Sequence, residues 1–325
     1  MSEEVQVSKM KGFQAHLFSE KYVLLWVILI LSVLSASISP AFLKLQNLMN
    51  ILWQSSFIGV IAIGATFVMV TGAIDLSVGS LTAFVGGIMV MALNWLMGTG
   101  FHIPGAIGIG IGVGIAMGYL TGLLVTKLRV VPFIATLGTM SIFRSLTLYL
   151  ANGGEFRSLD WSYTAIGMGE FAGVPIPVIL FLSYGVVAWV VLHNTPFGRH
   201  LYAVGANERS ARYAAIDVDR VRNLAYVFSG ISVALSAVVV SSMLNSVSSS
   251  TTGLGFELDA IAAAVIGGTS LSGGRGSVLG TILGVIVLSI IGNMLVMLNV
   301  SVYLQGTVKG VIVVAAILAQ RGRTF

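Results

Sequence analysis

The sequence predicts an all-α, polytopic membrane protein, and three observations support this fold class. Of the 325 residues, 56% are hydrophobic and only 9% are charged, whereas a soluble domain carries about 25% charged residues. The mean hydropathy is +0.97. The apolar residues form long runs without alternating polarity, which favours helices over strands in a membrane. No polar stretch is long enough for an extramembrane domain, so residues 1–325 are interpreted as a single transmembrane domain.

Ten apolar segments follow one another along the chain, some of them short or broken for a crossing that needs about 20 apolar residues. The predicted helices lie near 22–42, 51–72, 76–97, 104–126, 132–151, 174–194, 223–245, 259–274, 276–298 and 302–320. The first apolar run follows lysines and precedes small residues, as the apolar region of a secretory signal does. The many later spans nevertheless favour an uncleaved first helix.

The distribution of basic residues predicts the orientation, because Lys and Arg accumulate in cytoplasmic loops. The basic positions expected inside are Lys9, Lys11 and Lys21 at the N-terminus, Lys127 and Arg129 after four crossings, segment 195–222, and Arg321 and Arg323 at the C-terminus. The net acidic loop 152–173 is expected outside. Both termini are therefore predicted to be cytoplasmic, and this parity agrees with about ten transmembrane helices.

Small residues recur at every fourth position in two segments, which predicts closely packed helices. The two stripes are Gly110, Gly114, Gly118 and Gly122, and Ser272, Gly276, Gly280 and Gly284.

Two polar breaks interrupt the apolar pattern, one from Thr71 to Ser80 and one from Gly267 to Gly276. Asp75 is expected either to cap a helix that begins at Leu76 or to line a polar path, because a carboxylate costs roughly 2.5–3.5 kcal/mol at a bilayer centre. Polar backbone at membrane depth is tolerated inside protein or along a wet cavity, and transporters place substrate sites at such breaks. Both breaks follow crossings directed inward, so they are expected near the inner half of a translocation path. The residues predicted to line or gate this path, with helix capping and packing as the alternative, are Thr71, Asp75, Ser77, Thr269, Ser270 and Ser272.

The residue types exclude several other functions. The stretch 268–277 lacks the Gly-Lys-Ser/Thr of a nucleotide-binding P-loop, and no strand precedes it. The chain has no Cys and no His-Glu-x-x-His motif, and its four histidines lie apart, so no metal or cofactor is predicted. The net charge of +5 is spread over short segments, which does not indicate nucleic-acid binding. Nothing resembles a catalytic nucleophile with its base, so the chain is not predicted to be an enzyme.

Segment 199–222 is amphipathic and is expected in the cytoplasm. Asn207 is a favourable N-cap, and Glu208 in the first turn suits the helix dipole. Ala211, Ala214 and Ala215 would leave a shallow helix face that fits a groove of another protein. The alternative is a solvated interfacial loop.

Three stretches resemble bacterial monosaccharide (ribose-type) ABC transporter permeases. The sequence from Ala203 through Ile216 is similar to the cytoplasmic coupling segment of that family, and Gly72–Ser80 and Gly255–Gly274 are similar to its two most recognisable motifs. The resemblance covers essentially the whole chain and keeps the order of the motifs. Two positions depart from the family: Ala215, where relatives usually have Gly, and Ala73, where Gly is common.

The resemblance implies an ABC importer permease with a fold like that of the vitamin B12 importer rather than the maltose importer. It also implies a path for a sugar in the bacterial inner membrane. The partners that the resemblance implies are two ABC ATPase subunits that hydrolyse the ATP, a periplasmic sugar-binding protein, a second permease in a homo- or heterodimer, and the lipid bilayer. The residues it implies for ATPase coupling are Gly205, Asn207, Glu208, Ala211 and Ala215. The alternatives are an ABC permease for a non-sugar small polar solute and an ion-coupled secondary carrier.

Three charged residues remain open. Arg144 either snorkels toward a membrane face or pairs with a buried carboxylate. Glu257 is expected near the outer face, in a gate, in a contact with the binding protein or in a solvated loop. Asp259 is expected to cap the eighth helix, with a place on the polar path as the alternative.

Overall fold

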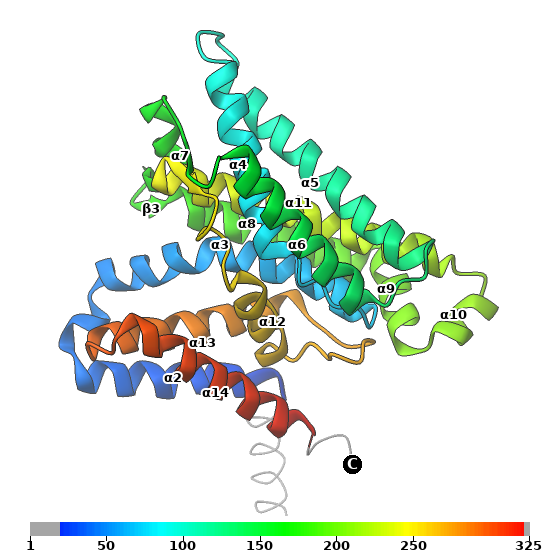
Figure 1. Cartoon of the computed structure of the whole chain (residues 1–325). Helices are drawn as coiled ribbons and strands as arrows, with labels where there is room; N and C mark the ends of the chain where they lie inside the picture. The colour runs from blue at the N-terminus through cyan, green and yellow to red at the C-terminus, as the bar shows by residue number, and fades with distance from the viewer. Residues whose placement is uncertain (1–19, 322–325) are drawn as a thin grey trace, which may run out of the picture.

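The computed structural model describes residues 20–321, and α-helices make up most of this part of the chain (Figure 1), which confirms the predicted all-α class. The helices are α2 (Glu20–Ile38), α3 (Leu45–Val70), α4 (Val78–Trp95), α5 (His102–Thr126), α6 (Pro132–Leu150), α7 (Thr164–Met168), α8 (Ile176–Asn194), α9 (Pro196–Ala206), α10 (Glu208–Tyr213), α11 (Val218–Leu244), α12 (Phe256–Ile266), α13 (Val278–Met297) and α14 (Val302–Arg321). The shorter elements are the 3-10 turns η1 (Pro40–Leu43) and η2 (Trp161–Tyr163) and the strands β1 (Glu155–Arg157), β2 (Glu170–Phe171), β3 (Val174–Pro175) and β4 (Ser246–Ser248).

Seven of the described helices are long and apolar enough to cross a membrane, namely α3, α4, α5, α6, α8, α11 and α13. The protein is therefore a multi-pass membrane protein. The predicted first, eighth and tenth segments correspond to α2, α12 and α14, which fall outside this group, so the count of ten crossings stays a prediction. Lys9, Lys11 and Arg323, which helped to place the termini, lie outside the described residues.

The centre of the bundle is formed by α3 and α11, with α4 and α5 packed on α11 and α12 and α13 packed on α3 (Figure 1). Gly114 and Gly118 of α5 lie against the backbone of Gly230 and Tyr226 of α11, where a Cβ on either glycine would lie 2.5 Å from a carbonyl oxygen. The first stripe of small residues thus brings two helix backbones together, as its spacing predicts. In the second stripe, Gly284 packs in the same way against Ala263 of α12.

The loop 152–173 and the segment that contains α9 and α10 lie at opposite ends of the bundle (Figure 1). Helix α8 directly connects the β2–β3 hairpin to α9, and its 19 residues span about 28 Å. In the loop, β1 pairs with β4 in antiparallel register, with Phe156 opposite Val247, and this pairing ties the loop to the end of α11. The opposite placement agrees with the predicted orientation, in which one of these segments is outside and the other inside.

The eighth predicted segment, 259–274, is displaced in the structure. Helix α12 begins at Phe256, after Gly255 in the left-handed conformation (φ 80°), and it ends at Ile266 because the following backbone is glycine-rich and non-helical. The prediction that Asp259 caps this helix is wrong, because Gly255 occupies the N-cap position. Asp259 instead lies in the first turn and forms an ion pair of 2.8 Å with Lys309 of α14.

Candidate functional site

The two polar breaks meet at one place, and the end of α9 joins them. The backbone N–H of Gly274 donates to the carbonyl of Val70 over 2.9 Å. A Cβ on Gly205 of α9 would overlap this same carbonyl and would lie 2.5 Å from the nitrogen of Gly274. The Tyr202 hydroxyl donates to the carbonyl of Gly276 over 2.7 Å. We call this contact, formed by residues 70–72, 202–206 and 273–276, the glycine junction, because only glycine lets three backbones approach so closely.

In the first break, Asp75 bridges the α3–α4 connection and α11. Its Oδ1 accepts hydrogen bonds from the backbone N–H (3.0 Å) and the hydroxyl (2.6 Å) of Ser77, and its Oδ2 accepts one from the Ser229 hydroxyl at 3.1 Å. Asp75 is 5% exposed, and Ser77 is the N-cap of α4, so Asp75 does not cap a helix that begins at Leu76. Thr71, at the other end of the break, donates its hydroxyl to the carbonyl of Val68 over 2.7 Å.

The second break folds into a compact turn. The Ser270 backbone N–H donates to the carbonyl of Arg275 over 3.0 Å, and the Ser270 hydroxyl accepts from the backbone N–H of Ser272 over 3.2 Å. Ser272 is exposed. Thr269 is fully buried, and its hydroxyl has no hydrogen-bond partner among residues 20–321. An unpaired buried hydroxyl costs about 1–3 kcal/mol, so Thr269 is the predicted path residue that this arrangement leaves unsatisfied.

The segment 199–222 forms two short helices rather than one. Asn207 joins α9 to α10, and its Oδ1 accepts a hydrogen bond of 3.0 Å from the backbone N–H of Ser210, which confirms the predicted N-cap. Glu208 lies in the first turn of α10, as predicted. Gly205 is in the last turn of α9, so the residue that touches the end of α3 and the second break lies three positions before Glu208.

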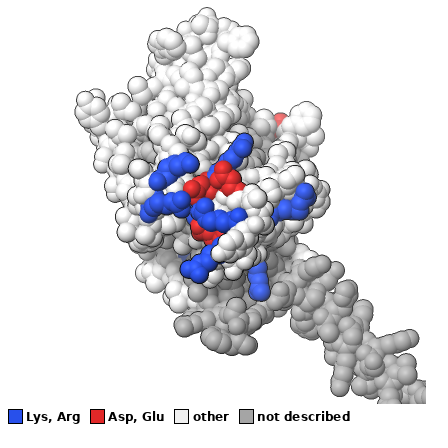
Figure 2. Space-filling model, turned by 90° about the vertical axis from the view of Figure 1, so that its right-hand side faces the viewer, with Lys and Arg blue, Asp and Glu red and all other residues white. Residues whose placement is uncertain are grey.

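Charged residues gather on the face that carries α9 and α10, with carboxylates surrounded by arginines (Figure 2). Glu208 accepts from Arg212 (3.0 Å) and Arg222 (3.1 Å), and Asp219 accepts from Arg212 (3.0 Å) and Arg129 (3.1 Å). Burial raises the pKa of Glu208, but the hydrogen bonds from the two arginines outweigh this effect and lower its pKa below the usual value. The ion pairs of Glu208 therefore stabilise the folded protein at pH values above the ordinary glutamate pKa. This stability is lost as the pH falls through the lowered pKa of Glu208.

This ion network ties α10 to the start of α11 and to the α5–α6 loop. Sequence reasoning did not select Arg129 and Asp219, which lie 90 positions apart. The only sequence signal for this ion pair was the excess of basic residues in the two loops. That excess predicts that both loops lie on the same side of the membrane, but it does not show which residues pair.

The placement of Ala211 contradicts its predicted position on a face open to a partner. Ala211 is 3% exposed and packs in the protein's own core with Val204 and Val218. A bulky side chain at this position would therefore disrupt internal packing rather than a docking face. The exposed side of α10 carries Arg209 and Tyr213, and Tyr213 is 91% exposed.

The departure from the family at Ala215 falls on a strained backbone position. Ala215 has a φ of 59°, its N–H donates to the carbonyl of Arg212, and the N–H of Ile216 donates to the carbonyl of Ala211, both over 3.0 Å. These two bonds form the Schellman motif that ends many helices, in which the left-handed residue is usually glycine.

We expect Ala215→Gly to raise the free energy of unfolding by about 1 kcal/mol, because glycine adopts the left-handed conformation without the Cβ penalty. Thermal unfolding of the purified protein in detergent measures the change. Ala214→Gly is the matched control, because Ala214 has a φ of −82° and gains nothing from glycine. A lower midpoint for Ala215→Gly than for the parent would contradict this explanation.

Arg144 and Glu257 lie on one cavity of about 420 Å³ between α6, α4 and the segment that precedes α12. The Arg144 guanidinium donates to the carbonyl of Ser249 over 2.8 Å. Glu257 is 8% exposed, so it is not a solvated loop residue.

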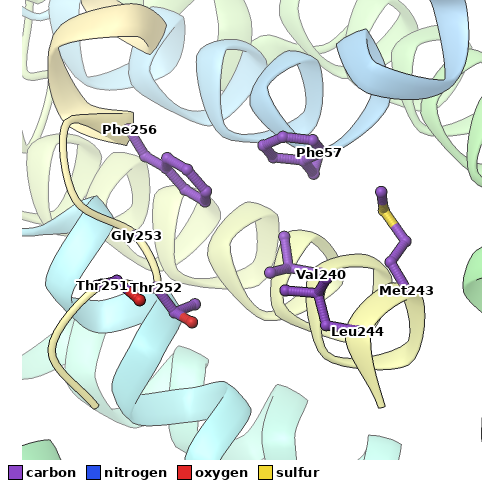
Figure 3. Close-up of a pocket in the computed structure, with 8 residues that line it drawn as sticks. All are labelled: Phe57, Val240, Met243, Leu244, Thr251, Thr252, Gly253 and Phe256. Carbon is purple, nitrogen blue, oxygen red and sulfur yellow. The ribbon is translucent and has the colours of Figure 1, made fainter. Parts of the chain in front are cut away.

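A second cavity, of about 310 Å³, lies on the other side of the same segment (Figure 3). Phe57 and Phe256 face each other on one side with ring centroids 5.2 Å apart, and Val240, Met243 and Leu244 of α11 form the opposite wall. The walls of this cavity are mostly apolar.

The chemistry of the breaks is that of reversible hydrogen bonding. Hydroxyls, backbone groups and one enclosed carboxylate can exchange partners with a polar solute without holding it tightly. Within residues 20–321, no three His, Asp or Glu side chains are placed to hold a metal ion.

Comparisons with known proteins agree with one another. The family described as branched-chain amino acid transport system / permease component matches residues 47–317. The chain is 42% identical over 301 residues to the ribose import permease of Bacillus subtilis, covering 91% of each chain. It is 37% identical over 295 residues to the ribose import permease of Escherichia coli K12, covering 90% of each. It is 35% identical over 317 residues to the D-allose transport system permease of that organism, covering 97% of this chain and 96% of the relative. No solved structure matches.

Proposed function

Because the chain belongs to the ribose-type permease family of ABC importers, we propose that its glycine junction couples the inner end of a sugar path to an ATPase partner. The protein is a permease subunit for sugar import and not an enzyme. Relatives are named for the import of ribose and of D-allose, so a monosaccharide is the solute class proposed here. ATP hydrolysis is then the task of a partner chain.

The observation that carries the proposal is the direct backbone contact of α9 with the end of α3, directly before the first break, and with the second break. Gly205 touches Val70 at the end of α3 and Gly274 in the second break, and no flexible side chain lies between them. A displacement of α9 and α10 therefore moves the ends of both breaks together. This is the mechanical link that an importer driven from the cytoplasmic side requires.

The charged face around α10 suits the docking of the ATPase. Tyr and Arg are enriched at the centres of protein interfaces, and Tyr213 and Arg209 are exposed there. Asn207 and Glu208 fix the start of α10 through the N-cap and the ion network. Ala211 secures the helix to the core, and Ala215 ends it.

The complete assembly that we propose contains two ABC ATPase subunits, a periplasmic sugar-binding protein and a second permease subunit in the bacterial inner membrane. The chain crosses the membrane ten times with both termini in the cytoplasm, in an arrangement like that of the vitamin B12 importer. The placement of loop 152–173 opposite the α9–α10 face supports this orientation, since the first is acidic and the second rich in arginine.

The path residues proposed are the polar side chains of the two breaks: Thr71, Asp75, Ser77, Thr269, Ser270 and Ser272. The unpaired hydroxyl of Thr269 supports this role, because a passing sugar hydroxyl or a rearranged break would satisfy it. Asp75 is held by three hydrogen bonds within the protein. This favours a role in a gate, which opens when these residues move, rather than a role as an ion-coupling site.

We expect Thr71→Val and Ser270→Val each to slow sugar uptake by about fivefold, the effect of losing one hydrogen bond of about 1 kcal/mol. Initial uptake rates in proteoliposomes that contain the assembled importer measure this effect. Thr126→Val is the matched control, because the Thr126 hydroxyl donates to a carbonyl of its own helix and belongs to neither break. Normal uptake by both variants would show that the breaks serve only for packing.

The proposed function is tested by a reconstitution in which one component at a time is left out. Labelled D-ribose and D-allose should accumulate only when the permease, its ATPase and its binding protein are present together. Uptake of either sugar by the permease alone would contradict the proposal. If neither sugar accumulates in the complete system but another polar solute does, the chain is an ABC permease for that solute.

A further inference from the structure

Non-helical backbone enters the interior of the bundle between α11 and α12. Gly253 of this segment touches Gly79 in the first turn of α4, so closely that a Cβ on either glycine would overlap the carbonyl oxygen of the other. The carbonyl of Ser249 accepts a hydrogen bond from Arg144 of α6, and the N–H of Ser249 donates to the carbonyl of Gly154 in the loop 152–173. Gly79 lies about 22 Å along α4 from Asn94, which bonds to the same loop, so segment 249–255 descends from the loop to about the middle of a hydrocarbon core that is roughly 30 Å thick.

Such backbone is tolerated at this depth only inside protein or beside a water-filled cavity. The cavity of about 420 Å³ described above lies directly beside it and is within the range of about 300–1,000 Å³ typical of small-molecule sites. Its polar lining comes from α4, α6, the segment itself and α12: Ser80, Ser141, Arg144, Ser145, Ser250 and Glu257.

The cavity contains one charge of each sign. Arg144 and Glu257 interact electrostatically within it. The Glu257 carboxylate rests against Gly79 in the first turn of α4, where the helix dipole favours negative charge. Ionisable residues at membrane depth are costly, and they commonly mark substrate pathways.

We infer that this cavity binds the transported monosaccharide halfway across the membrane. Glu257 accepts hydrogen bonds from sugar hydroxyls, Arg144 donates to hydroxyl or ring oxygens, and the serine hydroxyls do both. The two opposite charges leave the site nearly neutral overall, which suits an uncharged polyhydroxy solute. The inference rests on the proposed sugar-import function and adds the place where the sugar is held.

The apolar cavity on the other side of the segment lacks this chemistry (Figure 3). Its polar side chains are Thr251 and Thr252, and the Thr252 hydroxyl already accepts from the backbone N–H of Ser248. A sugar that entered it would leave most of its hydroxyls without partners.

A thiol-labelling experiment tests the site, and the chain suits it because it contains no cysteine. Ser145→Cys places one thiol in the cavity, and Ser162→Cys places one in the exposed loop 152–173 as a control that water reaches. The permease and its ATPase are assembled in proteoliposomes without the binding protein and treated with a membrane-impermeant thiol reagent. The labelling rate is compared in the absence of sugar and in the presence of D-ribose or D-allose. We expect labelling of Ser145→Cys that one of the sugars slows, and labelling of Ser162→Cys that neither sugar alters. Labelling of Ser145→Cys that neither sugar alters would overturn the inference.

Charge-neutral variants give a second measurement. Glu257→Gln and Arg144→Gln should each lower sugar uptake by about tenfold or more and remove the protection of Ser145→Cys, since bonds to charged groups are the stronger ones. Glu155→Gln and Arg157→Gln in the outer loop are the matched controls, and co-purification of the ATPase verifies assembly. Normal uptake by both cavity variants would overturn this site while leaving sugar import intact. Absence of ATP-driven sugar uptake by the unmodified protein would instead overturn the proposed function.

Discussion

Gly205→Val is expected to lower sugar uptake by at least about tenfold, because overpacking typically costs 1–3 kcal/mol and here no side chain can yield. The added Cβ would overlap the carbonyl of Val70 and press on the nitrogen of Gly274, which are both backbone atoms. The three segments of the glycine junction must then separate. The ATPase subunit should still dock, because the exposed residues of α10 are unchanged, so ATP hydrolysis should continue without sugar transport.

The measurements for this variant are sugar uptake, ATPase activity and co-purification of the ATPase subunit. Gly108→Val is the matched control, since a Cβ on Gly108 of α5 meets nothing within 4 Å. Full uptake by Gly205→Val would show that the contact of α9 with the breaks does not transmit the motion.

Asp75→Ala is expected to lower the free energy of unfolding by about 2–4 kcal/mol, because it removes the acceptor of several buried hydrogen bonds. The Ser77 N–H, the Ser77 hydroxyl and the Ser229 hydroxyl would lose their partner in the interior. Asp75→Asn should cost less, because the amide oxygen still accepts. Ser229→Ala, which removes a single donor, should cost about 1 kcal/mol.

Thermal unfolding and uptake per folded protein are measured together for these variants. If Asp75 gates the path, uptake per folded protein falls for Asp75→Asn while its stability is nearly kept. If Asp75 only holds the α3–α4 connection, uptake per folded protein stays at the parent's value. An Asp75→Ala protein as stable as the parent would contradict the bridge to α11.

The long helices could be predicted because apolar run length and small-residue spacing are local signals. The stripe at Gly110–Gly122 predicts close packing, and the structure packs its last three glycines on α11. The two breaks were equally visible, because polar and glycine residues interrupt apolar runs. Their meeting with Gly205 could not be predicted, since it joins three segments that lie far apart in the sequence, and a glycine does not identify the backbone that it contacts.

Short helices were the other failure, and α10 shows why. Its six residues cover less than two turns, so alanine spacing does not reveal which side faces the core, and Ala211 was assigned to the wrong one. The Asp75–Ser229 bond joins residues 154 positions apart, and Ser229 resembles the other small residues of its helix. Arg144 was noticed for its charge inside an apolar run and Glu257 for its charge near the outer face, but the cavity that they share depends on the path of segment 249–255.

The most direct measurement of the central claim, that this chain is the permease of an ATP-driven sugar importer, is the energy source of uptake. Labelled sugar uptake is followed in cells that express the permease with its ATPase and binding protein, after treatment with vanadate, an ATPase inhibitor, or with a protonophore at preserved ATP. Vanadate should abolish uptake, and the protonophore should leave it nearly unchanged. Uptake that survives vanadate and collapses with the protonophore would identify an ion-coupled carrier and contradict the claim.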